Sequence, residues 1–316
     1  MENTLIVLLG PTGIGKTAIS IRLAEWLNAP IISSDSRQFY RELKIGTAAP
    51  SDDDLKRVKH YFVGTHSITD LYNCGQYELD VIALLDKIFP ENKVALLTGG
   101  SMMYIDAVCN GIDDIPTIDE ETRNLWLQKY NENGLEFLQE ELKRLDPEHY
   151  NRVDLNNAKR VLHALEICDI AGRPYSDIRT GKKKERNFRI LKIGLEMPRE
   201  LLYERINLRV DKMMEDGLEE EARKFYAYRH LNTLNTVGYK ELFDCFSGEI
   251  SLEKAIELVK RDTRHYAKRQ MSWFKRDKEK MWFSPDDENA IKEYIKFPQA
   301  QASSNPSEGG EEEEGM

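Results

Sequence analysis

Hydrophobic positions in the first hundred residues follow two alternating patterns. Residues 3–10, 29–35 and 92–100 are continuous apolar runs typical of buried strands, whereas residues 16–27 and 76–89 repeat apolar side chains at helical spacing. Buried strands that lack alternation and are separated by helices indicate a parallel sheet covered on both faces. In such sheets the ligand crevice lies at the carboxyl ends of the strands, where we expect Asp35 and residues 98–101.

The pattern changes in the middle of the chain. Between about residues 119 and 180 the strand-like runs stop, and amphipathic helical patterns occupy 120–146 and 156–172. Strand character returns at 188–197, and a helix that opens with proline follows it. The predicted organisation is an α/β core at 1–117, a helical insertion at 118–182, the rest of the core with a basic C-terminal helix and an edge strand at 183–297, and a disordered acidic tail at 298–316.

Composition narrows the class of protein. The 316 residues are 41% hydrophobic and 32% charged, as in soluble globular proteins, and no apolar run is long enough to cross a bilayer. The start of the chain has neither a basic flank nor a cleavage site, so we expect a cytoplasmic protein. The four cysteines are widely spaced and form no C-x-x-C pair, which favours buried free thiols over a zinc site or disulfides.

Charge is unevenly distributed along the chain. The formal net charge of −10 includes five glutamates in the last nine residues, while basic residues are concentrated at 179–189 and 260–278. The second basic segment also carries aromatic side chains, which can stack on unpaired bases while lysine and arginine follow phosphates. Without further motifs, a solvated face with a buried aromatic stripe explains the same pattern.

A phosphate-binding loop lies between the first strand and the first helix. It matches G-x-x-x-x-G-K-[ST] in the strand–loop–helix context that this motif requires. Its amides and the helix N-terminus bind phosphate oxygens, the lysine neutralises charge, and the Thr17 hydroxyl can hold Mg²⁺. The positions are Gly10, Pro11, Thr12, Gly13, Ile14, Gly15, Lys16 and Thr17.

The loop alone does not decide which phosphate compound binds. ATPases usually place a metal-holding aspartate at the end of a later strand, but the run at 92–100 ends in Thr98 and two glycines. Phosphoryl transfer is therefore weakened as an interpretation. It stays open because Asp35 itself could hold the metal.

Five segments together resemble the tRNA dimethylallyltransferases, the IPP transferase family. They are 10–17, 33–50, 96–104, 157–167 and 236–242, and the resemblance runs from near residue 4 to about residue 283. It implies a P-loop NTPase-like parallel sheet with an all-helical insertion. It also implies Mg²⁺, dimethylallyl diphosphate in the loop, and transfer of the dimethylallyl group to N6 of adenosine 37, just after the anticodon, in tRNAs that read codons beginning with U.

The resemblance implies roles for residues near the loop. Thr12 to Thr17 match diphosphate contacts, and Asp35 matches the residue that takes a proton from the adenine amine, although a helix cap or Mg²⁺ ligand is the alternative. Ser101 keeps a hydroxyl where the family more often has threonine. Arg123 matches a basic residue near the reaction centre, or else is a solvated charge. Lys240 replaces an arginine and loses its bidentate diphosphate contact.

The resemblance also implies tRNA contacts, because a stacked base must be extruded to reach a buried isoprenoid. His163 replaces an arginine, so its phosphate contact would be weaker or pH-dependent, and a structural histidine is the alternative. No C-terminal zinc finger like that of the eukaryotic relatives is evident, and we expect a monomer. The implied tRNA-binding residues are Asp35, Ser36, Arg37, Gln38, Lys159, Arg160, Val161, Leu162 and His163.

Three other functions fit part of the pattern. An adenylate isopentenyltransferase shares the loop and Asp35 but acts on free AMP or ADP, and it would not need the insertion or the basic segments. A P-loop small-molecule kinase would need ATP and a separate metal acid. A nucleotide-dependent binding module without enzymatic activity fits least, because no base-specific guanine motif is evident.

Overall fold

The structure is a computed structural model that describes residues 2–297. The chain folds into two compact units: Asn110–Glu185 form one, and the chain up to Cys109 together with the chain from Arg186 onward form the other. We call these the helical unit and the core unit. The predicted acidic tail, 298–316, lies outside the described residues.

The core unit is built around a parallel sheet with the strand order β3-β2-β4-β1-β5-β6 in the described part of the chain. Every pair of neighbouring strands is parallel. The predicted α/β class with a P-loop-like parallel sheet is confirmed. The strands are β1 (Thr4–Leu9), β2 (Ile31–Ser33), β3 (His60–Tyr61), β4 (Val94–Gly99), β5 (Arg189–Leu195) and β6 (Met281–Phe283).

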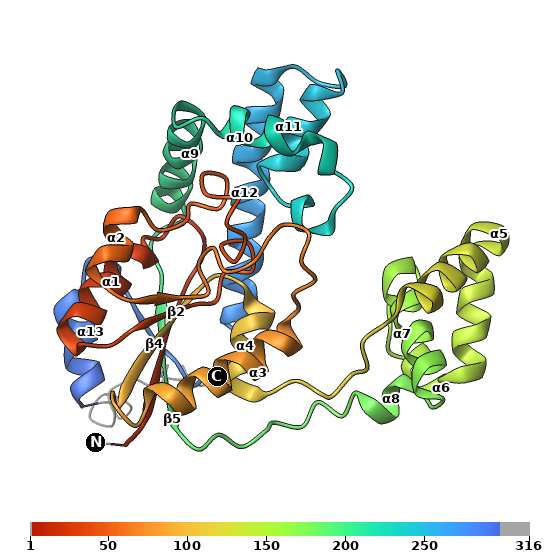
Figure 1. The fold of residues 1–316 in the computed structure, drawn as a ribbon, viewed down its shortest axis with the longest axis horizontal. Coiled ribbons are helices and arrows are strands. Elements are labelled where there is room, and N and C mark those ends of the chain that lie inside the picture. Colours follow the sequence, from red (N-terminus) through yellow and green to blue (C-terminus); the bar gives the residue numbers. More distant parts are fainter. Residues whose placement is uncertain (1, 298–316) are drawn as a thin grey trace, which may run out of the picture. The chain divides into compact units, whose positions relative to one another are not determined.

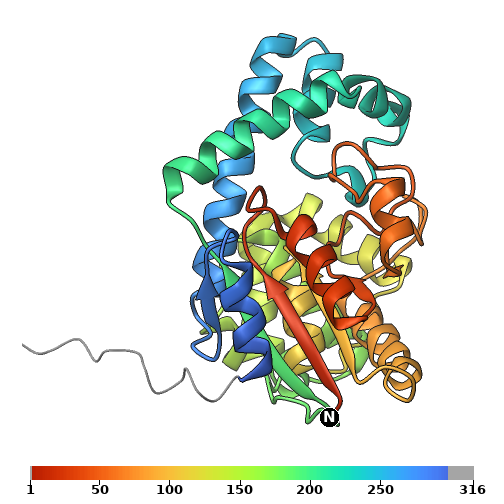
Figure 2. The same ribbon diagram turned by 90° about the vertical axis from the view of Figure 1, so that its left-hand side faces the viewer.

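Helices cover both faces of this sheet (Figures 1 and 2). Successive side chains of β1 point to opposite faces, so Ile6 and Leu8 pack on one side, against α1 and α13, while Leu5 and Val7 pack on the other, against α3 and α4. Burying each such side chain stabilises the fold by roughly 1.5–3 kcal/mol. The helices are α1 (Lys16–Leu27), α2 (Asp52–Arg57), α3 (Cys74–Ile88), α4 (Met102–Asn110) and α13 (Glu288–Lys296).

Helix α12 (Leu252–Phe274) connects three hydrophobic clusters of the core unit. Ala255, near its start, packs in a third cluster with α10 and α11, whereas Ala267 and Phe274 pack against the two faces of the sheet. One helix therefore fixes the position of the bundle above the strands. The remaining elements of the bundle are α9 (Arg199–Glu215), α10 (Leu218–Phe225), α11 (Tyr239–Phe246) and the short 3₁₀ helices Tyr226–Tyr228 and Asn232–Leu234.

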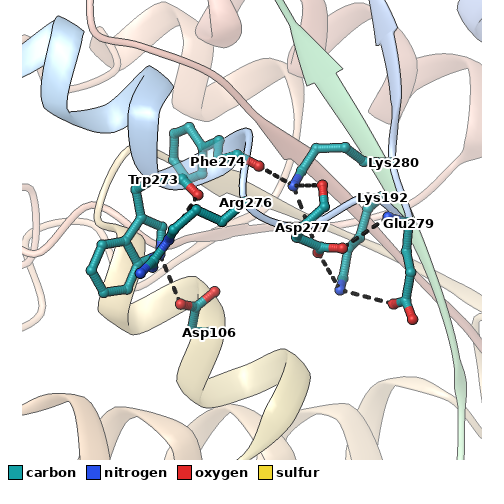
Figure 3. A network of polar contacts seen from close by, with 8 residues as sticks. All are labelled: Asp106, Lys192, Trp273, Phe274, Arg276, Asp277, Glu279 and Lys280. Carbon is teal, nitrogen blue, oxygen red and sulfur yellow. Dashed lines mark hydrogen bonds and ion pairs between the residues drawn. The ribbon is translucent and has the colours of Figure 1, made fainter.

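A polar network anchors the end of α12 to α4 and β5 (Figure 3). Trp273 Nε1 donates to Asp106 Oδ2 at 2.8 Å, and the Lys192 ammonium on β5 lies 2.7 Å from Asp277 Oδ2. Lys280 donates to the main-chain oxygens of Asp277 and Phe274. Burial opposes the charged form of Asp277, but the hydrogen bonds from Lys192 and the Glu279 amide and the charges of Lys192 and Lys280 together outweigh burial and lower the Asp277 pKa.

The helical unit contains the predicted segment 118–182. Its core is formed by side chains of α5 and α7 with Tyr175 and Ile178 of α8. The buried Asp146 caps α6, accepting from His149 N at 2.9 Å and from the Ser176 hydroxyl at 2.7 Å. The helices are α5 (Glu120–Leu145), which bends at Gly134, α6 (Pro147–Tyr150), α7 (Ala158–Ala171) and α8 (Tyr175–Ile178).

No helix of the described residues is both long and apolar enough to span a bilayer.

Candidate active site

The phosphate-binding loop connects β1 to the N-terminus of α1, which begins at Lys16. Gly15, which precedes the helix, has φ 99°, and a Cβ there would lie 2.9 Å from Arg205 Nη2. Glycine is therefore favoured by the backbone conformation, and the Arg205 side chain lies close enough that any Cβ would displace its tip. The helix dipole and the loop amides make this end of α1 a site for an anion.

Lys16 is held inside the loop. Its ammonium donates to the carbonyl oxygens of Gly10 and Pro11, both at 2.9 Å, although part of the side chain is reached by solvent. Burial of the ammonium lowers the Lys16 pKa to about 7; Asp35 partly opposes this shift and Arg209 adds to it. A bound anion would favour the charged form, so Lys16 is well placed to neutralise a phosphate.

Asp35 follows β2 at the carboxyl edge of the sheet. Its Oδ1 accepts from the amide of Arg37 at 3.0 Å and from that of Gln38 at 3.4 Å. No helix begins between β2 and α2, so these are contacts within a turn and not the helix cap considered as one alternative from the sequence. Among residues 2–297 its second oxygen, Oδ2, accepts no hydrogen bond, and Asp35 lines a cavity on each side of it. These two hydrogen bonds thus fix the carboxyl group and leave one oxygen for a ligand.

Ser101 joins the end of β4 to the Asp35 turn. The buried Ser101 hydroxyl accepts from Ser36 N at 2.8 Å and donates to the Ser36 hydroxyl at 3.0 Å. The residue after Asp35 is therefore fixed by a hydroxyl group of the next strand in the sheet. Both serines line the same cavity as Asp35.

Two adjoining cavities meet at Asp35. The first chamber, of about 450 Å³, is lined by the phosphate-binding loop, and the second, of about 360 Å³, by Ser36, Arg37, Ser101 and other polar residues. The Asp35 carboxylate therefore lies between the chamber with the phosphate-binding loop and the second, polar chamber. The residues that line both chambers are Thr12, Asp35, Thr47, Arg209 and Tyr266.

Two arginines of α9 complete the first chamber, and neither was predicted from the sequence. Arg209 Nη2 donates to the Thr12 hydroxyl at 2.5 Å, but its Nε has no hydrogen-bond partner among residues 2–297. Desolvation lowers the pKa of the Arg209 guanidinium, with Asp35 opposing. Arg205, one turn earlier, also lines the chamber. Arginines four residues apart also occur on solvated helix faces, so the sequence offers only a weak signal for this pair.

Tyr266 of α12 lines the same junction. Desolvation raises the pKa of Tyr266 to about 12, and its hydroxyl donates to Gly100 O at 3.4 Å. The phenol therefore stays neutral and can act as a hydrogen-bond donor. From the sequence, Tyr266 was one of several aromatic residues in a basic segment, and no role at the Asp35 turn was predicted for it.

Other predicted residues of the core unit are divided between the two chambers. Lys240, which was predicted to contact the diphosphate, lines the second chamber, and its ammonium lies 3.3 Å from Glu241 and 3.6 Å from Asp262. The arginines that line the first chamber belong to α9. Arg37 Nη1 donates to Thr233 O at 3.1 Å, and Gln38 Nε2 donates to the oxygens of Thr47 and Ala48. Thr17, the predicted metal ligand, lines the first chamber.

The remaining predicted residues belong to the helical unit. Arg123 lies in the first turn of α5, about half exposed, 3.8 Å from the buried carboxylate of Glu166. At the start of α7, Lys159, Arg160 and His163 are exposed. The side chains of Val161 and Leu162 are instead buried in the core of this unit, so they are not available for the direct contacts predicted for the segment.

The fold and the two chambers define a P-loop α/β protein in which the anion-binding chamber lies next to the Asp35 carboxylate. A family model described as IPP transferase matches residues 38–277. The chain belongs to the IPP transferase family.

Curated relatives and solved structures agree with this assignment. The chain is 60% identical over 294 residues to a tRNA dimethylallyltransferase 1 of Bacteroides thetaiotaomicron, covering 93% of this chain and 96% of the relative. A crystal structure of a tRNA isopentenylpyrophosphate transferase from Bacillus halodurans is 33% identical, with a TM-score of 0.68 and coverage of 95% and 97%. A structure of a eukaryotic dimethylallyltransferase acting on tRNA has a TM-score of 0.79 at 25% identity, with coverage of 97% and 81%.

Proposed function

We propose that this protein transfers the dimethylallyl group of dimethylallyl diphosphate to N6 of adenosine 37 in tRNA and releases diphosphate. The observation that carries the proposal is the position of Asp35, whose carboxyl group lines both the chamber with the phosphate-binding loop and the chamber beside it. A donor and an acceptor entering the two chambers would meet at this residue.

The first chamber would hold the donor. Loop amides, Lys16, Arg205 and Arg209 surround the position of the diphosphate, and all of them can stabilise negative charge. As the bond between C1 and the diphosphate oxygen breaks, charge builds up on the leaving group. Cations and amides that are already in place stabilise this charge without reorganising.

The second chamber would hold the everted adenine. The N6 amine attacks C1, the new C–N bond forms, and the amine proton passes to the unpaired oxygen of Asp35. The hydrogen bonds from the main-chain amides of Arg37 and Gln38 keep this carboxyl group in one orientation during the reaction. Ser101 acts through Ser36 to hold the same turn, and its hydroxyl could also contact the substrate.

Basic side chains would bind the RNA backbone. Arg37, Lys240 and Arg269 line the second chamber, which supports assigning Lys240 to the polynucleotide rather than to the diphosphate. In the helical unit, the exposed Lys159, Arg160 and His163 are proposed to contact the anticodon loop, together with Arg123. The expected substrates are tRNAs that read codons beginning with U.

The chemistry of the first chamber fits Mg²⁺ bound with the substrate. No group of three or more histidine, cysteine, aspartate or glutamate side chains that could hold a metal occurs among residues 2–297. Mg²⁺ often binds through substrate phosphates and few protein ligands, and the Thr17 hydroxyl would provide one ligand here. When bound, the ion would neutralise charge on the diphosphate. We further expect a cytoplasmic monomer.

The test is transfer of label from dimethylallyl diphosphate to tRNA that carries adenosine 37. We expect labelled tRNA, with the label on N6 of that nucleoside in a digest analysed by mass spectrometry. Labelling of AMP but not of tRNA would instead support an adenylate isopentenyltransferase. Turnover of the labelled γ-phosphate of ATP without isoprenoid transfer would support a kinase.

A further inference from the structure

The side chain of Gln270 joins the phosphate-binding loop to the end of β4. Its side chain is 1% exposed, and both of its polar atoms are used. Oε1 accepts from Thr12 N of the phosphate-binding loop at 2.8 Å, and Nε2 donates to Gly100 O at the end of β4 at 2.8 Å. A side chain at this position must carry an acceptor at one end and a donor at the other, as the neutral amide of glutamine does.

The hydrogen bond to Gln270 removes one loop amide, that of Thr12, from the donors that can bind a phosphate. The amide of Thr12 is already bonded to Gln270, so it does not face an incoming phosphate as a free donor. The hydroxyl of the same Thr12 accepts from Arg209. The outer end of the loop is therefore fixed from two helices, while Gly13, Gly15 and Lys16 line the chamber.

The other end of the Gln270 amide fixes the base side of the site. Gly100 immediately precedes Ser101, whose hydroxyl binds Ser36, the residue after Asp35. A Cβ on Gly100 would lie 2.3 Å from Gln270 Nε2, so glycine is needed for this close approach. A short chain of contacts thus runs from the loop through Gln270 to the turn that carries Asp35.

Helix α12 is itself held against the same segment one turn later. Trp273, three residues after Gln270 on the same helix face, donates to Asp106 of α4, the helix that begins directly after Ser101 (Figure 3). Beyond the helix end, Lys192 of β5 holds Asp277. Gln270 therefore projects from a rigid support.

We propose that Gln270 is a positioning residue that sets the separation between the leaving diphosphate and the Asp35 carboxyl group. The proposal rests on the function proposed above. Gln270 does not take part in proton transfer, because it bonds only to main-chain groups of the loop and of β4. Its loss would let the loop and the Asp35 turn shift relative to each other.

The first test compares Gln270→Leu with the wild type. A displacement of about 1 Å in an active site can cost about 100-fold in rate. We expect kcat with tRNA to fall about 100-fold, with KM for tRNA and Kd for dimethylallyl diphosphate within about fivefold of the wild type. Wild-type kcat, or losses in kcat and in diphosphate affinity of equal size, would overturn the proposal.

Two controls separate positioning from loss of stability. Ala255→Gly destabilises the same helix at a residue that lines neither chamber, and it should keep kcat even where its Tm falls as much as that of Gln270→Leu. Gln76→Leu removes an exposed amide of the same unit and should change neither quantity. A low kcat in Ala255→Gly would assign the effect to helix stability and overturn the proposal.

Gln270→Glu provides a sharper readout. A protonated glutamic acid has an acceptor and a donor like glutamine, whereas a carboxylate places an oxygen against Gly100 O. The kcat of Gln270→Glu relative to the wild type should therefore rise as the pH falls, while the ratio for Gln270→Leu stays constant. Lys16, Arg209, Tyr266 and Asp35 line the same chamber and are present in both proteins, so the ratio isolates the new group.

The two proposals can fail separately. If the wild type does not modify tRNA, the proposed function fails before Gln270 is tested. If the wild type modifies tRNA, and both Gln270→Leu and the pH ratio of Gln270→Glu are indistinguishable from the wild type, only the role of Gln270 is refuted.

Discussion

Replacing Arg209 by methionine should lower the activity without lowering the stability of the fold. The guanidinium lies in the first chamber with one hydrogen bond, from Nη2 to Thr12, and an Nε without a partner among residues 2–297. In the absence of substrate the protein therefore holds a desolvated cation that it does not fully satisfy. Methionine keeps much of the side-chain length and removes this charge.

The expected effect on catalysis follows from the number of contacts that are lost. Each hydrogen bond from a charged donor contributes about 1.5–3 kcal/mol, and removing one preorganised donor to a developing anion costs about 10²–10³ in kcat. We expect a loss of that size in single-turnover transfer to tRNA, together with weaker binding of inorganic diphosphate in calorimetry. The Tm without ligand should be unchanged or higher.

Arg199→Met is the matched control, because Arg199 lies in the first turn of the same helix with a side chain that is 74% exposed. It should behave like the wild type in all three assays. Transfer and diphosphate binding within twofold of the wild type in Arg209→Met would refute the assignment of this residue. A large fall in its Tm would instead show that the guanidinium stabilises the fold.

Two further predictions concern protonation. Because burial lowers the Lys16 pKa to about 7, affinity for inorganic diphosphate should fall by up to about tenfold per pH unit above pH 7 through this group. Lys16→Arg should lack that component in a calorimetric pH series, and equal slopes would contradict the prediction. The lowered pKa of Asp277 stabilises the fold above the unfolded pKa, so this contribution is lost as the pH falls through the folded pKa. In denaturant melts, Asp277→Asn should lower the free energy of unfolding at pH 7 by about 1 kcal/mol, since the Asp277 side chain is partly exposed, and progressively less below about pH 4. Glu279→Gln is the exposed control, and a pH-independent loss would contradict the prediction.

The hydrophobic pattern predicted much of the architecture. The apolar runs at 3–10 and 92–100 contain β1 and β4, and the loop motif lies between β1 and α1 as expected. The very short strand β3 and the helix α2 have no comparable pattern, because two or six residues carry too few positions to show a period. Family membership and the class of enzyme, predicted from the five motifs, are confirmed by the comparisons.

The site was less predictable than the fold. Asp35 and Ser101 were found because motifs mark them, but the α9 arginines and Gln270 come to the loop only through tertiary packing of α9 and α12. In the sequence they are ordinary polar residues of amphipathic helices. The helix cap considered for Asp35 is not observed, because a turn and not a helix follows it, whereas its roles as proton acceptor or Mg²⁺ ligand stay predictions.

The most direct test of the account is single-turnover transfer by Asp35→Asn, measured alongside its affinity for dimethylallyl diphosphate. Asparagine keeps an oxygen to cap the turn but cannot accept the amine proton. We predict a loss of about 10²–10⁴ in the transfer rate with diphosphate affinity within a few-fold of the wild type. A transfer rate close to that of the wild type, or a loss of donor binding as large as the loss of rate, would contradict the role of Asp35 as the proton acceptor.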